Sequence, residues 1–413
     1  MADSSDTART AGDCLLFSTA DWDEPYWTNK QHTARVLARR GWRVLYVESV
    51  GFRSPKLASG KDWARIWRRL RQGLRSNLIG AKQREPNVWV LSPLMIPAKH
   101  HWPMVRQLNQ ALLKLSIARF VRKYRCAEPV VWTYHPYMQT SVEGLARGPL
   151  VYHCVDDITA IPGVDVEAFE RAERQLLGSS DVVFTTAPAL YERCSRLNPN
   201  THFFANVADA DHFGRALEVG PLPPDLTQIP GPRLVYHGVL SDFKVDFSLI
   251  LAAARLRPGW QWIFIGSERE GQRSQGVAEL KQLPNVHFLG YRTYEQLPEY
   301  LRGMNVGLLP TRLNDYTRSM FPMKYFEYLA AGLPVVSTPL DFTRSQTAGL
   351  EVAATPEAFV LAVERQLQRG RLTLEEAAAL VGDNTWDART VKMLGYVWRK
   401  MGNVSPLQPA SAH

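Results

Sequence analysis

The chain has 413 residues, of which 45% are hydrophobic and 22% are charged, a composition typical of a globular protein with two domains. It contains no run of about 18 uninterrupted apolar residues, so no transmembrane helix is predicted. The polar first residues lack the apolar core of a signal peptide and the four cysteines form no CxxC pair, so we expect a cytoplasmic protein. The net charge of +9 implies an anionic partner.

The first half alternates short apolar runs with amphipathic stretches, the pattern of parallel strands connected by helices. Strands are predicted over 14–18, 43–49, 88–92, 130–134, 151–155, 181–186 and 202–206. Helices are predicted to begin near Asn29 and at Pro188 and to cover 102–124 and 166–177. We therefore expect residues 1–218 to form a first Rossmann-like domain.

One segment of the first half, residues 61–84, is strongly basic. It holds eight Lys or Arg and one acidic residue, which is +7 of the net charge of +9. On a helical wheel, Trp63, Trp67 and several leucines fall on one side and the arginines fall opposite. Such a helix either packs on its own domain or lies on an anionic membrane surface. Nucleic acid is the less favoured partner, because no known reader motif is present.

The second half begins after a proline-rich stretch. Residues 219–233 contain five prolines and no periodicity, which predicts an interdomain linker. Strands follow over 234–238, 260–266, 286–290, 306–310 and 335–338, and helices over 246–256, 294–303, 355–369 and 385–402. We expect residues 234–384 to form the second domain and 385–413 a terminal helix with a tail. The predicted fold class is α/β, with two doubly wound Rossmann-like domains facing across a cleft.

Ligands of such sheets bind beyond the carboxyl ends of the strands, and glycines end three predicted strands of the second half. Gly238, Gly266 and Gly290 allow a ligand to approach the backbone closely, and Lys244 follows the first of them. Glycine at a strand end is more often only part of a turn. These positions become informative only together with a charged segment further along the chain.

That segment is NDYTRSMFPMKYFEYLAAGLPVVST, residues 314–338. Pro322 suits the first turn of a helix, where free amides near Met323 and Lys324 would bind phosphate beside Arg318. Glu327 repels phosphate but can accept hydrogen bonds from two vicinal hydroxyls, as on a ribose. The pattern therefore favours a nucleoside diphosphate. The alternative is a capped helix whose Glu327 pairs with a surface lysine.

PMKYFEYLAAGLPVVST resembles the donor-site segment of the retaining nucleotide-sugar glycosyltransferases of the GT-B fold, glycosyl transferases group 1. SSDVVFTTAPALYERC, VYHCVDDITAIPG and the first βαβ unit resemble a branch that makes bacterial surface polysaccharides. The resemblance implies that Glu327 binds the ribose. It also implies that the terminal helix crosses back to the first domain. Ser319 stands where the family has the first acid of its E-x7-E motif, and Val239 replaces a diphosphate-binding arginine.

The expected donor-binding set combines the residues of both segments. It consists of Gly238, Lys244, Gly266, Tyr291, Thr317, Arg318, Ser319, Pro322, Met323, Lys324 and Glu327. Arg318 is expected to compensate for the arginine that Val239 replaces. No metal and no cofactor are expected, because no Asp-x-Asp motif is placed for a metal and a basic phosphate site is predicted instead.

The first domain is expected to bind the acceptor and the transferring sugar. His135, after a predicted strand, matches the family residue that contacts the donor sugar, although a histidine at a strand end is often structural. Asp156 and Asp157 follow another strand; one of them is expected to point into the cleft, with Asp157 favoured. The loop 20–30 offers rings for stacking on sugar. Its candidate acceptor-side residues are Trp22, Asp23, Asn29 and Lys30.

The resemblance implies transfer of a sugar from a nucleotide sugar to a saccharide or lipid-linked saccharide, with retention, in surface polysaccharide synthesis. The basic segment 61–84 would place such an enzyme on the inner face of the cytoplasmic membrane. A nucleotide-sugar epimerase of the same architecture and a non-catalytic membrane-bound partner subunit are the alternatives. Ser319 and Val239, which depart from the family pattern, are the residues that suggest the non-catalytic alternative.

Overall fold

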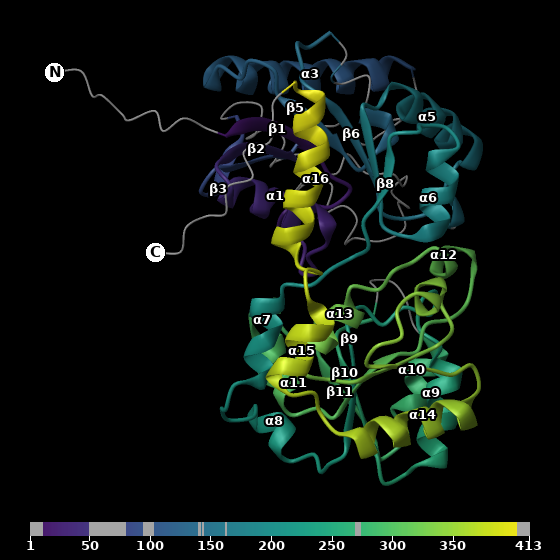
Figure 1. Ribbon diagram of the computed structural model, residues 1–413. Coiled ribbons are helices and arrows are strands. Elements are labelled where there is room, and N and C mark those ends of the chain that lie inside the picture. Colours follow the sequence, from purple (N-terminus) through teal and green to yellow (C-terminus); the bar gives the residue numbers. More distant parts are fainter. Residues whose placement is uncertain are drawn as a thin grey trace, which may run out of the picture. The chain divides into compact units, whose positions relative to one another are not determined.

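The computed structural model describes residues 11–48, 80–93, 103–138, 142, 144–161, 163–268 and 274–402. The chain forms two α/β units (Figure 1). The first unit comprises residues up to Thr185, Ala189–Phe204 and the chain from Thr390 on. The second unit comprises Thr186–Pro188 and Ala205–Arg389.

The first unit is built on one eight-stranded sheet in the order β3-β4-β2-β1-β5-β6-β7-β8. The strands are β1 (Gly12–Phe17), β2 (Trp42–Val47), β3 (Lys82–Glu85), β4 (Val88–Leu91), β5 (Val130–Thr133), β6 (Leu150–Cys154), β7 (Val182–Thr185) and β8 (Thr201–Phe203). All neighbours are parallel except β3, which runs antiparallel to β4. The central strands β5 and β6 are buried along their whole length and β1 over its last four residues, as expected where helices cover both faces of a parallel sheet.

Helices cover both faces of this sheet. They are α1 (Asn29–Arg39), α3 (Pro103–Tyr124), α5 (Val166–Ser179), α6 (Pro188–Ser195) and α16 (Trp386–Lys400), with short 3-10 turns η1 (Pro136–Met138) and η2 (Ile158–Ala160). Val151 of β6 belongs to the core that contains α1 and α16, whereas the next residue, Tyr152, bonds Glu173 of α5. Since successive side chains of a strand point to opposite faces, α5 lies on the other face.

The last helix contributes to the core of the first unit. Met393, Leu394 and Val397 of α16 are buried in one cluster with Trp42 and other side chains of the first sheet. Only the first residues of α16, up to Arg389, belong to the second unit. The sequence led us to expect this return of the terminal helix to the first domain.

The second unit is built on a parallel six-stranded sheet in the order β11-β10-β9-β12-β13-β14. The strands are β9 (Arg233–His237), β10 (Gln261–Ile265), β11 (Val286–Gly290), β12 (Val306–Leu309), β13 (Val335–Ser337) and β14 (Leu350–Val352). The strand order reverses between β9 and β12, and in the first unit between β1 and β5. Such a reversal is where open α/β sheets bind ligands.

Two apolar layers enclose the second sheet. The helices are α7 (Ala210–Gly214), α8 (Pro224–Thr227), α9 (Phe247–Leu256), α10 (Gln275–Leu280), α11 (Leu297–Arg302), α12 (Asp315–Arg318), α13 (Lys324–Ala330), α14 (Pro356–Arg369) and α15 (Leu374–Val381), with 3-10 turns η3 (Arg215–Leu217), η4 (Tyr294–Gln296) and η5 (Asp341–Arg344). Val235 of β9 packs with α7, α8, α11, α13 and α15, whereas Leu234 and Tyr236 pack with α9, α10 and α14. The predicted fold class, with two doubly wound Rossmann-like domains, is confirmed.

The proline-rich stretch 219–233 differs from its prediction. It belongs to the second unit and is not a linker: Pro224 begins α8, Leu226 is fully buried, and Asp225 pairs with Arg292 at 2.6 Å. Proline removes backbone donors, but it does not prevent neighbouring side chains from packing. Apart from the short piece Thr186–Pro188, the chain passes to the second unit at Phe204–Ala205 and returns at Arg389–Thr390, whereas the expected domains were 1–218 and 234–384.

The basic segment 61–84 lies outside the described residues up to residue 79. At its end, Lys82–Glu85 form the edge strand β3 instead of continuing a helix. The sequence analysis also missed β14, α10 and α15, which are short elements. Among the described residues, no helix combines the length and the apolar character needed to cross a membrane.

Candidate functional site

Three neighbouring strands of the second sheet end in glycines with left-handed backbone. The φ angles of Gly238, Gly266 and Gly290 are +121°, +146° and +75°. The amide of Gly238 donates to the carbonyl of Ile265, and the amide of Gly266 donates to the carbonyl of Gly290, each at 2.8 Å. A Cβ atom on Gly266 would lie 1.9 Å from the Gly238 carbonyl oxygen, so this position requires glycine. The glycines therefore let the ends of the three strands approach one another closely, at the point where a ligand of such a sheet is expected.

The side chain of Lys324 lies against the first of these glycines. A Cβ atom on Gly238 would lie 2.7 Å from Lys324 Cε and 3.0 Å from Lys324 Nζ. Burial lowers the pKa of Lys324, and the nearby Glu327 acts in the opposite direction. An ammonium group thus sits directly at the glycine-lined end of β9, where it can pair with an anionic ligand.

Glu327 lies one turn further along α13 and faces the same strand. Its Oε2 atom is 3.4 Å from Nε2 of His237, the last residue of β9, and its side chain is 13% exposed. The pKa of Glu327 is raised to about 7, chiefly by burial. Lys324 acts to lower this pKa, and Asp209 acts to raise it. Burial, helped by Lys324, holds the pKa of His237 well below its usual range, so this imidazole is neutral. A carboxylate placed in this way can accept hydrogen bonds from two adjacent hydroxyl groups.

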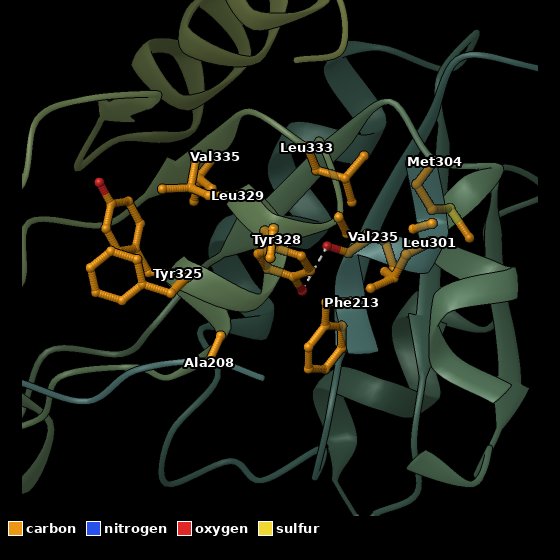
Figure 2. Close-up of a cluster of buried hydrophobic side chains, with 14 of the residues drawn as sticks. Ala208, Phe213, Val235, Leu301, Met304, Tyr325, Tyr328, Leu329, Leu333 and Val335 are labelled. Atoms are coloured by element: carbon orange, nitrogen blue, oxygen red, sulfur yellow. Dashed lines mark hydrogen bonds between the residues drawn. The ribbon is translucent and has the colours of Figure 1, made fainter. Parts of the chain in front are cut away.

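Tyr328 fixes the position of α13 on the sheet. Its hydroxyl donates to the Val235 carbonyl oxygen at 3.2 Å and accepts from the His237 amide at 3.1 Å. Figure 2 shows the phenol pointing toward Val235 within the buried cluster. Its ring lies over β12, because a Cβ atom on Gly307 would be 2.4 Å from Tyr328 Cγ. The sequence analysis did not identify Tyr328, although an aromatic residue beside Glu327 and a glycine inside a strand were visible signals.

The loops after β9 and β12 meet at the reversal of strand order. Val245 and Thr311 form an antiparallel bridge, and the Arg312 amide donates to the Lys244 carbonyl oxygen at 2.8 Å. The ammonium of Lys244 donates to the Tyr316 hydroxyl at 3.4 Å and lies 4.9 Å from the centre of that ring. The structure thus places Lys244 in the loop after β9, as expected.

The remaining predicted donor-side residues occupy varied environments. Thr317 is fully buried and forms a reciprocal cap with Asn314, at 2.9 Å in both directions, so its hydroxyl shapes the turn. Arg318 is 68% exposed and lies 4.0 Å from Asp315. Pro322 is buried, Ser319 and Met323 are half-buried, and Tyr291 is exposed. The helix begins at Lys324, two residues later than the sequence suggested, with Met323 as its N-cap residue.

In the first unit, three predicted residues meet at the carboxyl ends of β1, β5 and β6. Lys30 Nζ lies 3.6 Å from Asp156 Oδ2, and the Lys30 side chain is only 8% exposed. It also lies 5.7 Å from the ring centre of Tyr134, whose hydroxyl donates to the Asn29 carbonyl oxygen at 3.2 Å. Asn29, Lys30 and Asp156 therefore form one polar group at the reversal of strand order in this sheet.

Asp157 is engaged elsewhere in the same unit. Its Oδ1 atom accepts from the Thr159 hydroxyl at 2.6 Å and from Arg193 Nη1 at 3.1 Å. Arg193 also reaches Glu173, a buried acid, at 3.2 Å. The sequence favoured Asp157 over Asp156, but these contacts commit Asp157 to a structural network. Asp156 lies beside Lys30 and is 35% exposed, so it is the better placed of the two acids to contact a ligand.

His135 and Trp22 are largely enclosed. His135 is 1% exposed, its Nδ1 accepts from the Tyr137 amide at 3.0 Å, and burial lowers its pKa to about 3. The imidazole is therefore neutral at physiological pH. Trp22 is 5% exposed and packs on Trp27 and Tyr46 with ring centres 5.0 Å apart in both cases, so its faces are not available for stacking on sugar. Asp23 pairs with Arg84 at the surface.

Among the described residues, no group of three or more His, Cys, Asp or Glu side chains is placed to hold a metal ion. The charged residues of the second-unit site lie in the loop after β9, on α12 and on α13. The charged residues predicted for this site are Lys244, Arg318, Lys324 and Glu327, and Asp209 lies near enough to Glu327 to raise its pKa.

Residues 231–369 match the model of the family Glycosyl transferases group 1, and this range includes every predicted donor-binding residue. TuaH of Bacillus subtilis (strain 168), whose name places it in teichuronic acid biosynthesis as a glycosyltransferase, is 33% identical over 183 residues. That match covers 43% of this chain and 45% of TuaH, less than half of the relative's length.

Solved structures resemble nearly the whole chain. Sucrose-phosphate synthase from Thermosynechococcus elongatus has a TM-score of 0.65 at 15% identity, over 95% of this chain and 99% of that one. HepE of Anabaena, in complex with UDP and glucose, has a TM-score of 0.61 at 16% identity, over 92% of this chain and 99% of HepE. At such identities the likeness shows the fold, which is the GT-B fold.

Proposed function

We propose that this protein is a glycosyltransferase that moves a sugar from a nucleotide-sugar donor to a saccharide acceptor during synthesis of a cell-surface polysaccharide. The observation that carries the proposal is the placement of Lys324 and Glu327 at the glycine-lined end of β9. The match to glycosyl transferases group 1 over 231–369 and the relative named for teichuronic acid biosynthesis support it.

In this proposal the donor's diphosphate lies at the end of β9 beside Gly238 and pairs with Lys324, whose side chain lies against that glycine. Glu327, whose Oε2 atom lies 3.4 Å from Nε2 of His237, accepts hydrogen bonds from the two ribose hydroxyls. Lys244 and Arg318 add positive charge from the neighbouring loop and α12. A nucleoside diphosphate suits this set because one part of it is anionic and the attached part carries vicinal hydroxyls. UDP, the ligand of HepE, is the first nucleotide to test.

Catalysis would consist of positioning and of stabilising the departing diphosphate. Negative charge develops on the leaving oxygen, and each lost cationic contact to it is expected to raise the barrier by roughly 2–4 kcal/mol. We propose retention with attack on the same face that the diphosphate leaves. The acceptor hydroxyl would pass its proton to the departing diphosphate oxygen as the new glycosidic bond forms. Asp157 is paired with Arg193, which makes it a poor candidate for a covalent nucleophile.

The acceptor would bind at the group formed by Asn29, Lys30 and Asp156. This group offers an ammonium and a carboxylate 3.6 Å apart, which together can hydrogen-bond adjacent sugar hydroxyls as donor and acceptor. We propose a lipid-linked saccharide as the acceptor class. The basic segment 61–84 would hold the enzyme at the inner face of the cytoplasmic membrane, where such an acceptor is found. No cofactor and no metal enter the proposed reaction.

The test combines ligand binding with product analysis. Nucleoside diphosphates and nucleotide sugars are screened by thermal shift, where a ligand at about 100 times its dissociation constant should add roughly 2.7 kcal/mol to the free energy of unfolding. The stabilising nucleotide sugar is then incubated with and without saccharide acceptors. We expect a glycosylated acceptor. Conversion of the donor to its epimer without an acceptor, or no stabilisation by any nucleotide, would overturn the proposal.

A further inference from the structure

Helix α3 is attached to the first sheet by one face only. Of the side chains of α3 that the structure describes, those of Asn109, Leu113, Ile117 and Phe120 are buried. The rings of Phe120 and Tyr124 lie 6.0 and 4.9 Å from that of Trp89 in β4, which fixes the helix to this side of the sheet. In Figure 1 the helix runs along the top of the first unit.

The opposite face of α3 carries large apolar side chains in the open. Met104 is 80% exposed, and Leu108 and Leu115 are each 48% exposed. With the exposed Ala111, they are spaced by four, three and four residues, so they form one line of about 16 Å along the helix. Single exposed apolar residues are ordinary, but a continuous line of them marks a surface that contacts something.

The same line ends in positive charge. Arg119 and Arg122, both exposed, continue it in the last turns of the helix, with Lys123 beside them. The 22 residues of α3 include no Asp or Glu. Apolar side chains bordered by Arg and Lys without acids are typical of helices that lie in the interface of an anionic bilayer.

We propose that this α3 stripe, made of Met104, Leu108, Leu115, Arg119 and Arg122, docks on an anionic lipid surface. A second copy of the chain fits the stripe less well. Two such helices paired face to face would bury four arginines and provide no carboxylate on either helix to neutralise them. The inference is independent of segment 61–84 and of the reaction catalysed, because it rests on other residues.

Sedimentation with vesicles tests the proposal on the full chain. The wild type should bind vesicles of mixed phosphatidylcholine and phosphatidylglycerol, and the Leu108→Gln/Leu115→Gln variant should bind them at least about tenfold more weakly, because half-exposed leucines would be buried in the interface. The matched control is Leu361→Gln/Leu374→Gln, which changes leucines that are 51% and 68% exposed in the second unit and should bind like the wild type. Arg119→Gln/Arg122→Gln should weaken the preference for phosphatidylglycerol without abolishing it, because the basic segment 61–84 is unchanged in this variant.

Vesicle binding of the Leu108→Gln/Leu115→Gln variant equal to that of the wild type would overturn the proposal. So would light scattering that shows a wild-type dimer and a monomeric leucine variant with unchanged vesicle binding, which would assign the stripe to a second copy. Donor binding by the variants reports separately on the proposed transferase site. It should be unchanged, since the substituted side chains are exposed on α3 and belong to the first unit.

Discussion

Nε2 of His237 and Oε2 of Glu327 lie 3.4 Å apart at the end of β9, with both side chains almost enclosed. Burial drives both groups toward their neutral forms: it raises the pKa of Glu327 to about 7 and lowers that of His237. A free site would therefore hold a Glu327 that is only partly ionised near neutral pH. A ligand that needs the carboxylate must displace its proton.

This relationship predicts a pH-dependent affinity for nucleotide sugars. With a pKa of about 7, the ionised fraction of Glu327 rises from about one tenth at pH 6 to about nine tenths at pH 8, so affinity should increase about tenfold over that range. Titration calorimetry with a nucleotide sugar measures it, because the diphosphate of that ligand does not titrate near pH 7. Glu327→Gln should bind more weakly and with a flat profile. An equal slope in this variant would contradict the assignment.

Gly238 should tolerate no side chain. In Gly238→Ala the new Cβ atom would meet Lys324 Cε at 2.7 Å, and alanine at a φ of +121° is strained by roughly 1–3 kcal/mol. Displacement of Lys324 should weaken nucleotide-sugar binding by about tenfold or more. Gly259→Ala is the matched control, since nothing lies within 4 Å of its Cβ position and donor affinity should not change. Equal affinities in the two variants would refute the close contact.

Asp156 and Asp157 should differ in what their loss affects. Asp157→Asn removes a partner of Arg193 and should lower the free energy of unfolding by about 1–3 kcal/mol, measured by urea denaturation. Asp156→Asn should instead reduce transfer to the acceptor by about tenfold or more while donor affinity stays constant. If Asp157→Asn loses transfer activity but keeps the full free energy of unfolding, Asp157 would be the functional acid of the two, as the sequence analysis favoured.

Arg371 should be a large contributor to stability, remote from the chemistry. Its guanidinium donates to the carbonyl oxygens of Leu301 at 2.9 Å, Met304 at 2.5 Å and Ala331 at 2.7 Å, and burial lowers its pKa to about 10. Arg371→Ala leaves these carbonyls without their donor and should cost about 2–5 kcal/mol of unfolding free energy.

Arg371→Lys should restore only part of the unfolding free energy that Arg371→Ala loses, because one ammonium group cannot reach all the carbonyl oxygens to which the guanidinium group donates. Arg365→Ala is the control: Arg365 pairs with Glu351 at 2.8 Å but is 54% exposed, so its loss should cost much less unfolding free energy than the loss of Arg371. Chemical denaturation compares the three variants. A similar loss for Arg371→Ala and Arg365→Ala would show that the buried contacts contribute little.

The sequence was informative where local pattern decides structure. Buried strands such as Val130–Thr133 are short apolar runs, and the parallel sheets follow from their alternation with helices. Lys324 stood out because Pro322 predicts a helix N-terminus, where free amides and a cation can bind phosphate. Glu327 stood out because an acid one turn later repels phosphate but suits the hydroxyls of a ribose. The structure places both at the end of β9, although α13 begins later than Pro322 suggested.

Contacts between distant segments could not be predicted in this way. Trp22 lies in a loop rich in aromatics, and only the fold shows that Tyr46 of β2 and Trp27 enclose it. The pairing of Asp157 with Arg193 joins residues 36 positions apart. Prolines indicate where backbone donors are missing, but they do not show whether a segment is exposed. The proline-rich stretch 219–233 was therefore predicted to be a linker, although Leu226 within it is buried.

The central claim is that Lys324, at the glycine-lined end of β9, binds the diphosphate of a nucleotide sugar. Calorimetric titration of wild type and Lys324→Met with the nucleotide sugar that stabilises the protein tests it most directly. Methionine keeps the length and apolar character of the side chain and removes only the charge, and burial already disfavours that charge, so the variant should stay folded. We predict at least about tenfold weaker binding in Lys324→Met. Equal affinity in the two proteins would contradict the account.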